Sequence, residues 1–322
     1  MNEKLCSVVI IGAGFSGMCM AIQLKKSGFD DFIVLEEADE VGGTWRENTY
    51  PGAECDIPSA LYSYSFEHNA KWRYKWSGQE QILDYQKGIA KKYGLYAHIR
   101  FNQHVCAAKY CQAETHWVVD TKSGERYFCQ HLVSAVGQLH IPSIPEFANA
   151  NSYQGTAFHS ARWNHAIDLS GKRVAVIGNA ASALQFIPQI APRVKHLTVF
   201  QRSPNWVIAK RDRRYSRFEQ WISEKIPWVT RMYRLRLWLR GELLLLPAMR
   251  RNRLARWLLR RETLASLRQH IKDPAIIDKL TPAYPVGAKR ILFSDDYYQA
   301  LARDNVKLDT AGVKQFTEQG IV

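Results

Sequence analysis

Three glycines with the spacing of a phosphate-binding turn, Gly12, Gly14 and Gly17, follow the β-branched run Ser7–Ile11. In such a turn the first glycine permits the tight bend, the second lets backbone N–H groups approach a pyrophosphate, and the third lets a helix pack closely on the strand. Glu36 closes the next apolar run, where an acid is suited to bond a ribose hydroxyl. The pattern predicts a dinucleotide site.

A second turn of the same type begins at Gly178, with Ala180 and Ala183 where the other two glycines would stand. Arg202 lies as far beyond Gly178 as Glu36 lies beyond Gly12. An acid suits a free ribose 2′-hydroxyl and an arginine suits a 2′-phosphate. The sequence therefore predicts one FAD or NAD site and one NADP site. The alternative for each charge is an ordinary solvated side chain at a strand end.

The elements that must position these turns form two strand–turn–helix–strand units. The first ends at Phe32–Leu35, and the second runs from Arg173–Ile177 through a helix ending at Ile190 to Leu197–Phe200. We therefore predict an α/β fold with two Rossmann-like dinucleotide-binding domains.

Between the two units, Trp117–Asp120 and Arg126–Cys129 flank a polar turn and predict a β-hairpin. The run His131–Val136 predicts a separate buried strand, and the proline-containing stretch Ile141–Pro145 predicts an extended crossover.

From Val207 to Lys279 the sequence is rich in Arg, Leu and Trp and predicts helices interrupted at Pro227, Pro247 and Pro274. We interpret this segment as a helical insertion. Near the end of the chain, Val313–Phe316 and a polar turn predict a short hairpin.

The chain has 322 residues, of which 46% are hydrophobic, and a formal net charge of +14. Residues 210–272 contain 18 basic and 5 acidic residues, a balance of +13, so the rest of the chain carries only +1. This excludes a uniformly basic nucleic-acid coat. Three interpretations of the basic segment remain: a solvated helical face, peripheral attachment to anionic lipid, and nucleic-acid binding, which no recognition motif accompanies.

All six cysteines precede residue 130, and they form neither a CxxC pair nor a zinc-finger pattern. We expect reduced thiols, no metal site and a cytoplasmic protein. The first apolar run leads directly into the glycine turn, without the pattern of a signal peptide.

Further motifs resemble the Baeyer–Villiger monooxygenases, which are class B flavoprotein monooxygenases. They are Gly42-Gly43-Thr44-Trp45, the segment from Tyr50 to Asp56, the fingerprint formed by Tyr153, Gly155, His159 and Trp163, and the segment from Tyr284 through Lys289 to Arg290. Tyr153 and Asn164 depart mildly from the family's fingerprint. The motifs follow the family order over nearly the whole chain.

The resemblance implies FAD and NADPH as cofactors and a ketone and O2 as substrates. It implies that Arg290, with Asp56 as its partner, stabilises a peroxyflavin and the adduct that this forms with the ketone. The implied FAD-binding residues are Gly12, Gly14, Gly17, Glu36, Gly43, Thr44, Trp45 and Asp56, and the implied NADPH-binding residues are Gly178, Ser182, Arg202 and Lys289.

The predicted domains are an FAD-binding domain at 1–145, an NADP-binding domain at 146–207 and 280–322, and the basic insertion at 208–279. Trp163 argues against the related N-oxidising monooxygenases. An N- or S-oxygenating enzyme and an inactive nucleotide- or membrane-binding remnant stay open. Because the family continues after the last hairpin, we expect the chain to be incomplete as an oxygenase and to retain FAD weakly.

Overall fold

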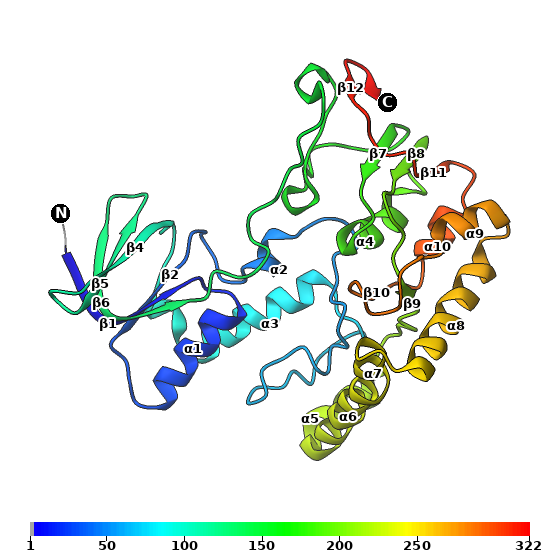
Figure 1. Ribbon diagram of the computed structural model, residues 1–322. Coiled ribbons are helices and arrows are strands. Elements are labelled where there is room, and N and C mark those ends of the chain that lie inside the picture. Colours follow the sequence, from blue (N-terminus) through cyan, green and yellow to red (C-terminus); the bar gives the residue numbers. More distant parts are fainter. Residues whose placement is uncertain (1–2) are drawn as a thin grey trace. The chain divides into compact units, whose positions relative to one another are not determined.

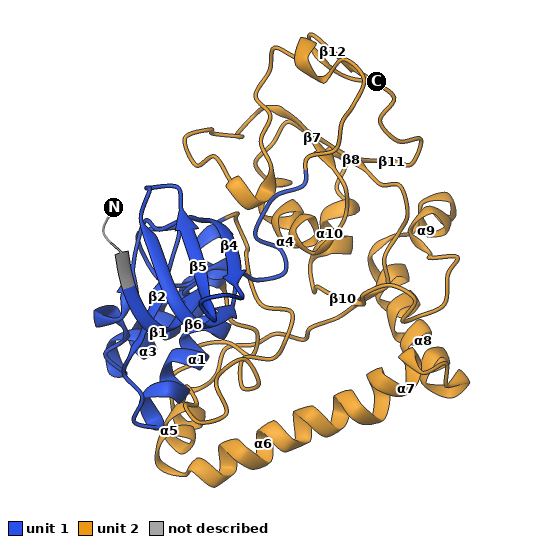
Figure 2. Ribbon diagram, turned by 60° about the vertical axis from the view of Figure 1, so that its left-hand side comes forward, with its two compact units in different colours: residues 1–49, 79–143 blue, residues 50–78, 144–322 orange. Residues whose placement is uncertain are grey.

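The computed structural model describes residues 3–322 and divides them into two compact units (Figure 2). The first unit holds the described residues as far as Thr49, together with Gln79–Ser143. The second holds Tyr50–Gly78 and Ile144–Val322. The segment Tyr50–Gly78 therefore belongs to the second unit, although it follows directly after the first strands of the chain.

A six-stranded sheet in the order β3-β2-β1-β6-β5-β4 forms the first unit. The strands β3, β2, β1 and β6 run parallel, and β6, β5 and β4 form an antiparallel meander. The strand bounds are β1 Glu3–Ile11, β2 Phe32–Leu35, β3 Ile99–Arg100, β4 Val105–Cys111, β5 His116–Thr121 and β6 Arg126–Ser134.

The helices of this unit cover the parallel strands. In α1, Phe15–Lys26, the buried residues Met18, Ala21 and Ile22 recur at helical spacing, and the helix ends at Ser27. The others are α2 Thr44–Glu47, α3 Gln79–Lys92 and the short 3₁₀ turn η1 Leu95–Ala97. The helix α3 was not predicted from the sequence.

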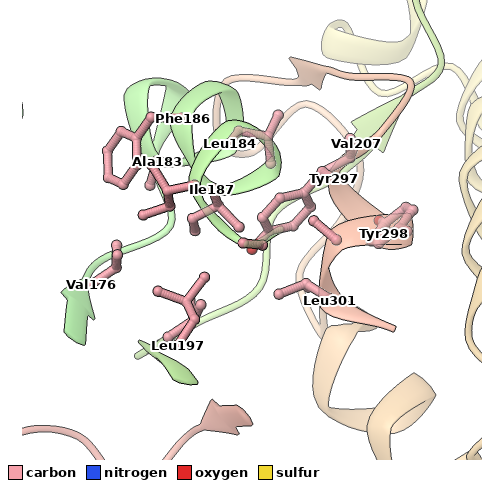
Figure 3. Close-up of a cluster of buried hydrophobic side chains, with 14 of the residues drawn as sticks. Val176, Ala183, Leu184, Phe186, Ile187, Leu197, Val207, Tyr297, Tyr298 and Leu301 are labelled. Atoms are coloured by element: carbon pink, nitrogen blue, oxygen red, sulfur yellow. The ribbon is translucent and has the colours of Figure 1, made fainter. Parts of the chain in front are cut away.

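The second unit repeats the same topology in a three-stranded parallel sheet, β11-β8-β7 (Figure 1). Its strands are β7 Arg173–Ile177, β8 His196–Phe200 and β11 Val306–Asp309. The helices α4, Ala181–Ile190, and α10, Tyr297–Leu301, bring Leu184, Ile187, Tyr297 and Leu301 into one buried cluster with Leu197 (Figure 3).

Five helices and a π-helical turn lie between β8 and α10, as predicted for the insertion. They are α5 Arg217–Lys225, α6 Pro227–Arg240, η4 Gly241–Leu245, α7 Leu246–Met249, α8 Arg253–His270 and α9 Pro274–Leu280. The short strands β9 Val207–Ile208 and β10 Leu292–Phe293 flank these helices and pair in parallel. Two 3₁₀ turns, η2 Ala150–Ser152 and η3 Ser160–Arg162, precede β7.

The α/β prediction with two Rossmann-like units is confirmed. The terminal hairpin is also present, as β12 Phe316–Thr317 and β13 Gly320–Ile321. Among residues 3–322, no helix is both long and apolar enough to cross a membrane.

Two predictions of local structure are wrong. The second hairpin strand and the run beginning at His131 form one strand, β6, which pairs with β5 on one side and β1 on the other. The run is also only partly buried, since His131 is exposed. Pro247 does not interrupt its helix, because the wide turn at Gly241–Leu245 precedes it and a proline near a helix start needs no N–H partner.

Candidate functional site

The glycine turn of the first unit is built as the sequence predicts. Gly12 has a φ of 100°, and a side chain there would meet the Ala135 carbonyl oxygen at 2.6 Å. At Gly17 a Cβ would lie 1.8 Å from the Gly12 oxygen, so helix α1 approaches the turn too closely for any side chain. Around Gly14, by contrast, the nearest atom to such a Cβ is the Gly43 Cα, at 3.9 Å.

The second glycine pair, Gly42 and Gly43, lies against this turn. The Gly42 N–H donates to the Ala13 oxygen at 3.1 Å, and a Cβ at Gly43 would lie 3.3 Å from the Gly14 Cα. Thr44 and Trp45 follow at the start of α2, Thr44 exposed and Trp45 half-buried. The structure therefore brings both predicted glycine motifs to one edge of the sheet.

Glu36 is buried beside the same turn. Its carboxylate accepts hydrogen bonds from the Ala13 N–H at 2.7 Å, from the Ala38 N–H at 3.1 Å and from the Arg46 guanidinium at 3.1 Å. Sequence reasoning missed Arg46, since nothing marks an arginine ten residues away as its partner. A carboxylate offers about four acceptor positions, so these contacts leave one for a ribose hydroxyl.

This edge fits a dinucleotide. No side chain caps the start of α1, and no acidic residue stands in its first turn. Uncapped N–H groups at a helix start favour a phosphate, and the space around Gly14 lets one come close. The residues present are thus those that the pyrophosphate and the ribose of FAD require.

The turn of the second unit has almost the same backbone. Gly178 has a φ of 104°, and no atom lies within 4 Å of a Cβ built there. Ala180 stands at the start of α4 without a side-chain cap, and Ala183 is buried in its first turn. The Asn179 amide donates to the Gln201 side-chain oxygen at 2.8 Å, which ties the turn to the end of β8.

The predicted equivalence of Arg202 with Glu36 is wrong by one residue. Ile11 pairs with Leu35 and Ile177 pairs with Phe200, so the residue in the position of Glu36 is Gln201. The cause is a connection one residue shorter in the second unit, which counting from the glycine cannot reveal. Arg202 follows Gln201 and is exposed. Its predicted role toward NADPH is untested by this geometry.

Lys289 lies at the same strand end as Arg202. Its ammonium donates to the hydroxyl of Ser203, the neighbour of Arg202, at 2.8 Å, and it lies 4.7 Å from the centre of the Tyr284 ring. Two exposed cations thus flank the end of β8. This arrangement fits the 2′-phosphate of NADPH, which favours paired charged donors.

Ser182, in the first turn of α4, hydrogen-bonds the Tyr50 hydroxyl. That hydroxyl donates to the Gln185 side-chain oxygen at 2.8 Å, and burial raises the pKa of Tyr50. Ser182 is therefore connected to the segment Tyr50–Gly78, a contact that sequence reasoning did not foresee.

Asp56 and Arg290 form an ion pair within the second unit, 234 residues apart in the chain. Arg290 precedes β10, and the Asp56 side chain is 20% exposed. The Arg290 side chain is 63% exposed, so the described residues do not provide the dry surroundings that the resemblance implies. The pair itself is the contact that the two motifs predicted.

A buried polar cluster holds the segment that carries Asp56. The Lys210 ammonium, 2% exposed, pairs with the Glu54 carboxylate and lies 5.4 Å from the centre of the Trp76 ring. The Gln185 amide donates to the Glu54 carbonyl oxygen at 2.9 Å. Burial raises the pKa of Glu54, and the charge of Lys210 opposes that shift. Sequence reasoning missed Gln185, and it counted Lys210 only as part of a basic segment.

The four fingerprint residues also lie in the second unit. His159 Nδ1 accepts the Ala161 N–H at 3.1 Å and caps η3. The Trp163 ring lies 5.2 Å from that of Phe186 on α4, and the Tyr153 ring lies 5.9 Å from that of Phe316. A Cβ at Gly155 would collide with the Tyr153 ring. Their visible contacts are structural ones.

All six cysteines are free thiols, three of them buried. Burial raises the pKa of the Cys55 thiol to about 12, so this thiol stays protonated at neutral pH. In the described part of the chain, no group of His, Cys, Asp and Glu side chains could hold a metal ion.

Comparison with known proteins agrees with this geometry. Residues 9–237 match the family described as pyridine nucleotide-disulphide oxidoreductase, well over half of the chain. The chain belongs to this oxidoreductase family. Both glycine turns lie inside the matched residues.

Among curated relatives of this family member, a Baeyer–Villiger monooxygenase of Streptomyces coelicolor is 41% identical over 308 residues. That alignment covers 96% of this chain and 59% of the relative. An FAD-binding monooxygenase of Aspergillus niger is 38% identical, over 98% of this chain and 54% of the relative. The resemblance to Baeyer–Villiger monooxygenases is confirmed, and the chain spans a little over half the length of these relatives.

A solved structure is similar over the whole oxidoreductase chain. Cyclohexanone monooxygenase from Rhodococcus sp. Phi1, bound to NADP+, superimposes with a TM-score of 0.87 at 27% identity. The match covers 100% of this chain and 68% of that one. Both Rossmann-like units and the helices between β8 and β11 are thus included in the similarity.

Proposed function

We propose that this chain is the dinucleotide-binding part of an FAD- and NADPH-dependent monooxygenase that oxidises a ketone to an ester or lactone. The Arg290–Asp56 ion pair is the observation that supports this most, because a cation oriented by a carboxylate suits a reaction in which negative charge develops. The names of the Streptomyces and Aspergillus relatives support the same reaction and cofactor.

FAD would bind at the glycine turn of the first unit. The backbone around Gly14 would hold the pyrophosphate and Glu36 a ribose hydroxyl, while Gly12 and Gly17 maintain the turn. Gly43, Thr44 and Trp45 would border the same edge. Bound FAD, reduced by NADPH, would supply the activated oxygen that is inserted beside the carbonyl group.

NADPH would bind at the turn of the second unit. Gly178 and Ser182 would border its pyrophosphate, and Arg202 with Lys289 would bind its 2′-phosphate. The cations account for a choice of NADPH over NADH, because each would leave a charged hydrogen bond unmade with NADH. The NADP+ bound to the Rhodococcus enzyme supports this choice.

Arg290 would keep a positive charge at the reacting centre throughout, since a guanidinium does not lose its proton in proteins. Asp56 would fix the direction of that charge, and the Glu54–Lys210 pair would hold the segment carrying Asp56. His159 and Trp163 would act on the linker rather than on substrate. Tyr153 and Gly155 belong to the same linker.

We further propose 1–145 as the FAD-binding domain, 146–207 with 280–322 as the NADP-binding domain, and 208–279 as its insertion. The topology supports this, because each domain would contain one parallel β-strand unit with its own glycine turn. The segment Tyr50–Gly78 would belong to the FAD domain by sequence while packing with the second unit.

The absorption spectrum of the purified chain tests cofactor binding, and product analysis tests the reaction. We expect a flavin spectrum after loading with FAD, NADPH oxidation, and ester or lactone from a cyclic ketone. Products only from an amine or a sulfide would favour an N- or S-oxygenating enzyme. A chain that takes up neither FAD nor NADPH would contradict the proposal altogether.

Arg290→Ala should abolish ester formation while flavin reduction by NADPH largely survives. Arg193→Ala is the matched control, because Arg193 also forms an exposed ion pair with an aspartate in the second unit, at 3.1 Å from Asp168. Equal ester formation by the two variants would refute the role of Arg290.

A further inference from the structure

The longest helical rod of the insertion has an apolar outer face. The helix α6 continues through the π-helical turn into α7, so the chain is helical from Pro227 to Met249 (Figure 2). Five side chains on it recur at i, i+4, i+7, i+11 and i+15, which is one face of a helix. This α6 stripe consists of Trp228, Met232, Leu235, Leu239 and Leu243, and each is between 40% and 74% exposed.

The opposite face of the same helix packs on the second unit. Arg234 donates to the Ala60 carbonyl oxygen and, at 3.2 Å, to the Ser63 hydroxyl. Ala248, near the end of the rod, is fully buried. The exposure of the stripe is therefore not due to a helix that projects freely into solvent, because the helix is held by its inner face and presents its outer one.

Arginines border the stripe on both sides. Arg231 lies on one side of it, and Arg236 and Arg240 lie on the other, all three exposed. None of the exposed residues in Pro227–Arg240 is acidic. Trp238, 52% exposed, extends the apolar surface at one edge.

Neighbouring helices present the same chemistry. In α8, Leu254 and Trp257 are 65% and 53% exposed, and the guanidinium of Arg261 lies 5.5 Å from the centre of the Trp257 ring. In α5, the exposed rings of Phe218 and Trp221 stack at 6.0 Å. Exposed aromatic rings beside arginines thus recur on three consecutive helices of the insertion.

We propose that the α6 stripe docks on the surface of an anionic phospholipid bilayer, with the helix lying parallel to the membrane. Leu, Met and Trp side chains would enter the headgroup–acyl boundary, and the flanking arginines would bind lipid phosphates. Arginine suits this position because its aliphatic stem lies along apolar groups while its head reaches the phosphates. Charge complementarity selects anionic lipid, since three cations and no exposed anion border the stripe.

Other macromolecules fit this face less well. A nucleic acid would use the arginines but leave the five apolar side chains in water. A second copy of this chain would bring further arginines against these, because the face carries only positive charge. The bilayer is the partner that satisfies both parts of the surface.

Cosedimentation with vesicles tests the proposal. We expect the chain to bind phosphatidylcholine vesicles that contain about a third phosphatidylglycerol, to bind vesicles of phosphatidylcholine alone much more weakly, and to be released by about 0.5 M NaCl. Equal binding to both vesicle types, or no binding to the anionic ones at low salt, would overturn it.

Two triple variants separate charge from apolar burial. Arg231→Gln, Arg236→Gln and Arg240→Gln together should weaken binding to anionic vesicles about a hundredfold, at about fivefold for each arginine. The control with the same loss of charge is Lys122→Gln, Lys172→Gln and Lys195→Gln, three exposed lysines outside the insertion, which should change binding little.

The apolar triple, Met232→Gln, Leu235→Gln and Leu239→Gln, keeps the charge and should also lose about a hundredfold. Its control is Leu5→Gln, Phe29→Gln and Tyr110→Gln, three exposed apolar residues of the first unit. Equal binding by a triple and its control would overturn the proposal. So would binding of duplex DNA in place of vesicles, or a wild-type dimer that the apolar triple converts to a monomer.

Discussion

Both units turn their chain at a glycine with a positive φ, 100° at Gly12 and 104° at Gly178. Two residues later, Gly14 and Ala180 have nearly the same extended backbone, with ψ of −168° and −174°. Any residue adopts this conformation, so alanine is no obstacle there. The first turn requires its third glycine because α1 approaches to within 1.8 Å of a Cβ, whereas α4 leaves room for Ala183. The third position therefore reports helix packing and not the ligand.

The two units also differ in the origin of their charges. In the first, Glu36 is held by Ala13 and by Arg46, ten residues away. In the second, the residue in the equivalent position is neutral Gln201, and both nearby carboxylates come from the segment Tyr50–Gly78. One turn carries its own acid, while the other receives its acids from a distant segment.

The largest expected effect comes from Gly17→Ala. Its Cβ cannot fit against the Gly12 oxygen, so we expect a loss of more than about 3 kcal/mol in the free energy of unfolding, measured by denaturant titration. Gly88→Ala in α3 of the same unit is the control: nothing lies within 4 Å of its Cβ, and it should stabilise by about 1 kcal/mol. Equal effects would show that helix packing does not distinguish the turns.

Lys210→Met tests the charges that the second unit receives. Removing the cation leaves Glu54 partly buried without its partner, which should cost about 3 kcal/mol at neutral pH. Burial already raises the pKa of Glu54, and without Lys210 it rises further, so the neutral carboxyl is favoured in the folded state. The stability of the variant is therefore greatest below the ordinary glutamate pKa and is lost as pH rises through the folded-state value.

Denaturant titrations of Lys210→Met at acid and neutral pH measure this difference. The double variant with Glu54→Gln should recover most of the loss, because no unpaired charge remains. A cost that is independent of pH would contradict the buried pair.

Gln201→Glu gives the second turn the acid of the first. Gln201 is 1% exposed and its amide donates to the Lys279 carbonyl oxygen at 3.0 Å, a bond that a carboxylate cannot make. We expect a loss of about 2 kcal/mol at neutral pH that shrinks on acidification, as the protonated acid donates again. Gln269→Glu, exposed on α8, should change stability by less than about 0.5 kcal/mol. Full tolerance of Gln201→Glu would mean that the two strand ends are interchangeable.

The smallest expected effect concerns nucleotide choice. If Arg202 binds the 2′-phosphate, its exposed charged hydrogen bond is worth about 1.5 kcal/mol, or roughly a tenfold preference for NADPH over NADH. Binding of each nucleotide, followed by fluorescence, should show this preference lost in Arg202→Ala and kept in Arg193→Ala, with FAD content unchanged in both. An unaltered ratio of affinities in Arg202→Ala would remove Arg202 from the site.

Local pattern was enough to predict much of the fold. The strands at Phe32–Leu35 and Arg173–Ile177 were predicted to the residue, because short β-branched runs bounded by glycine leave few alternatives. The single strand β6 was missed because pairing with two different neighbours is a property of the sheet and not of the strand's own residues. Pro247 was misread for a similar reason, since a π-helical turn upstream has no signal in the sequence.

The sequence by itself determined the two glycine turns, because a positive φ and a close helix approach restrict the residue type at each position. It also singled out Asp56 and Arg290, through motifs shared with known monooxygenases. Only the tertiary structure decided that Gln201 takes the place of Glu36, because strand register depends on pairing rather than on counting. Only it revealed Arg46, Gln185 and Lys210, because a buried charge or amide obtains its partners from whichever segment the fold packs beside it.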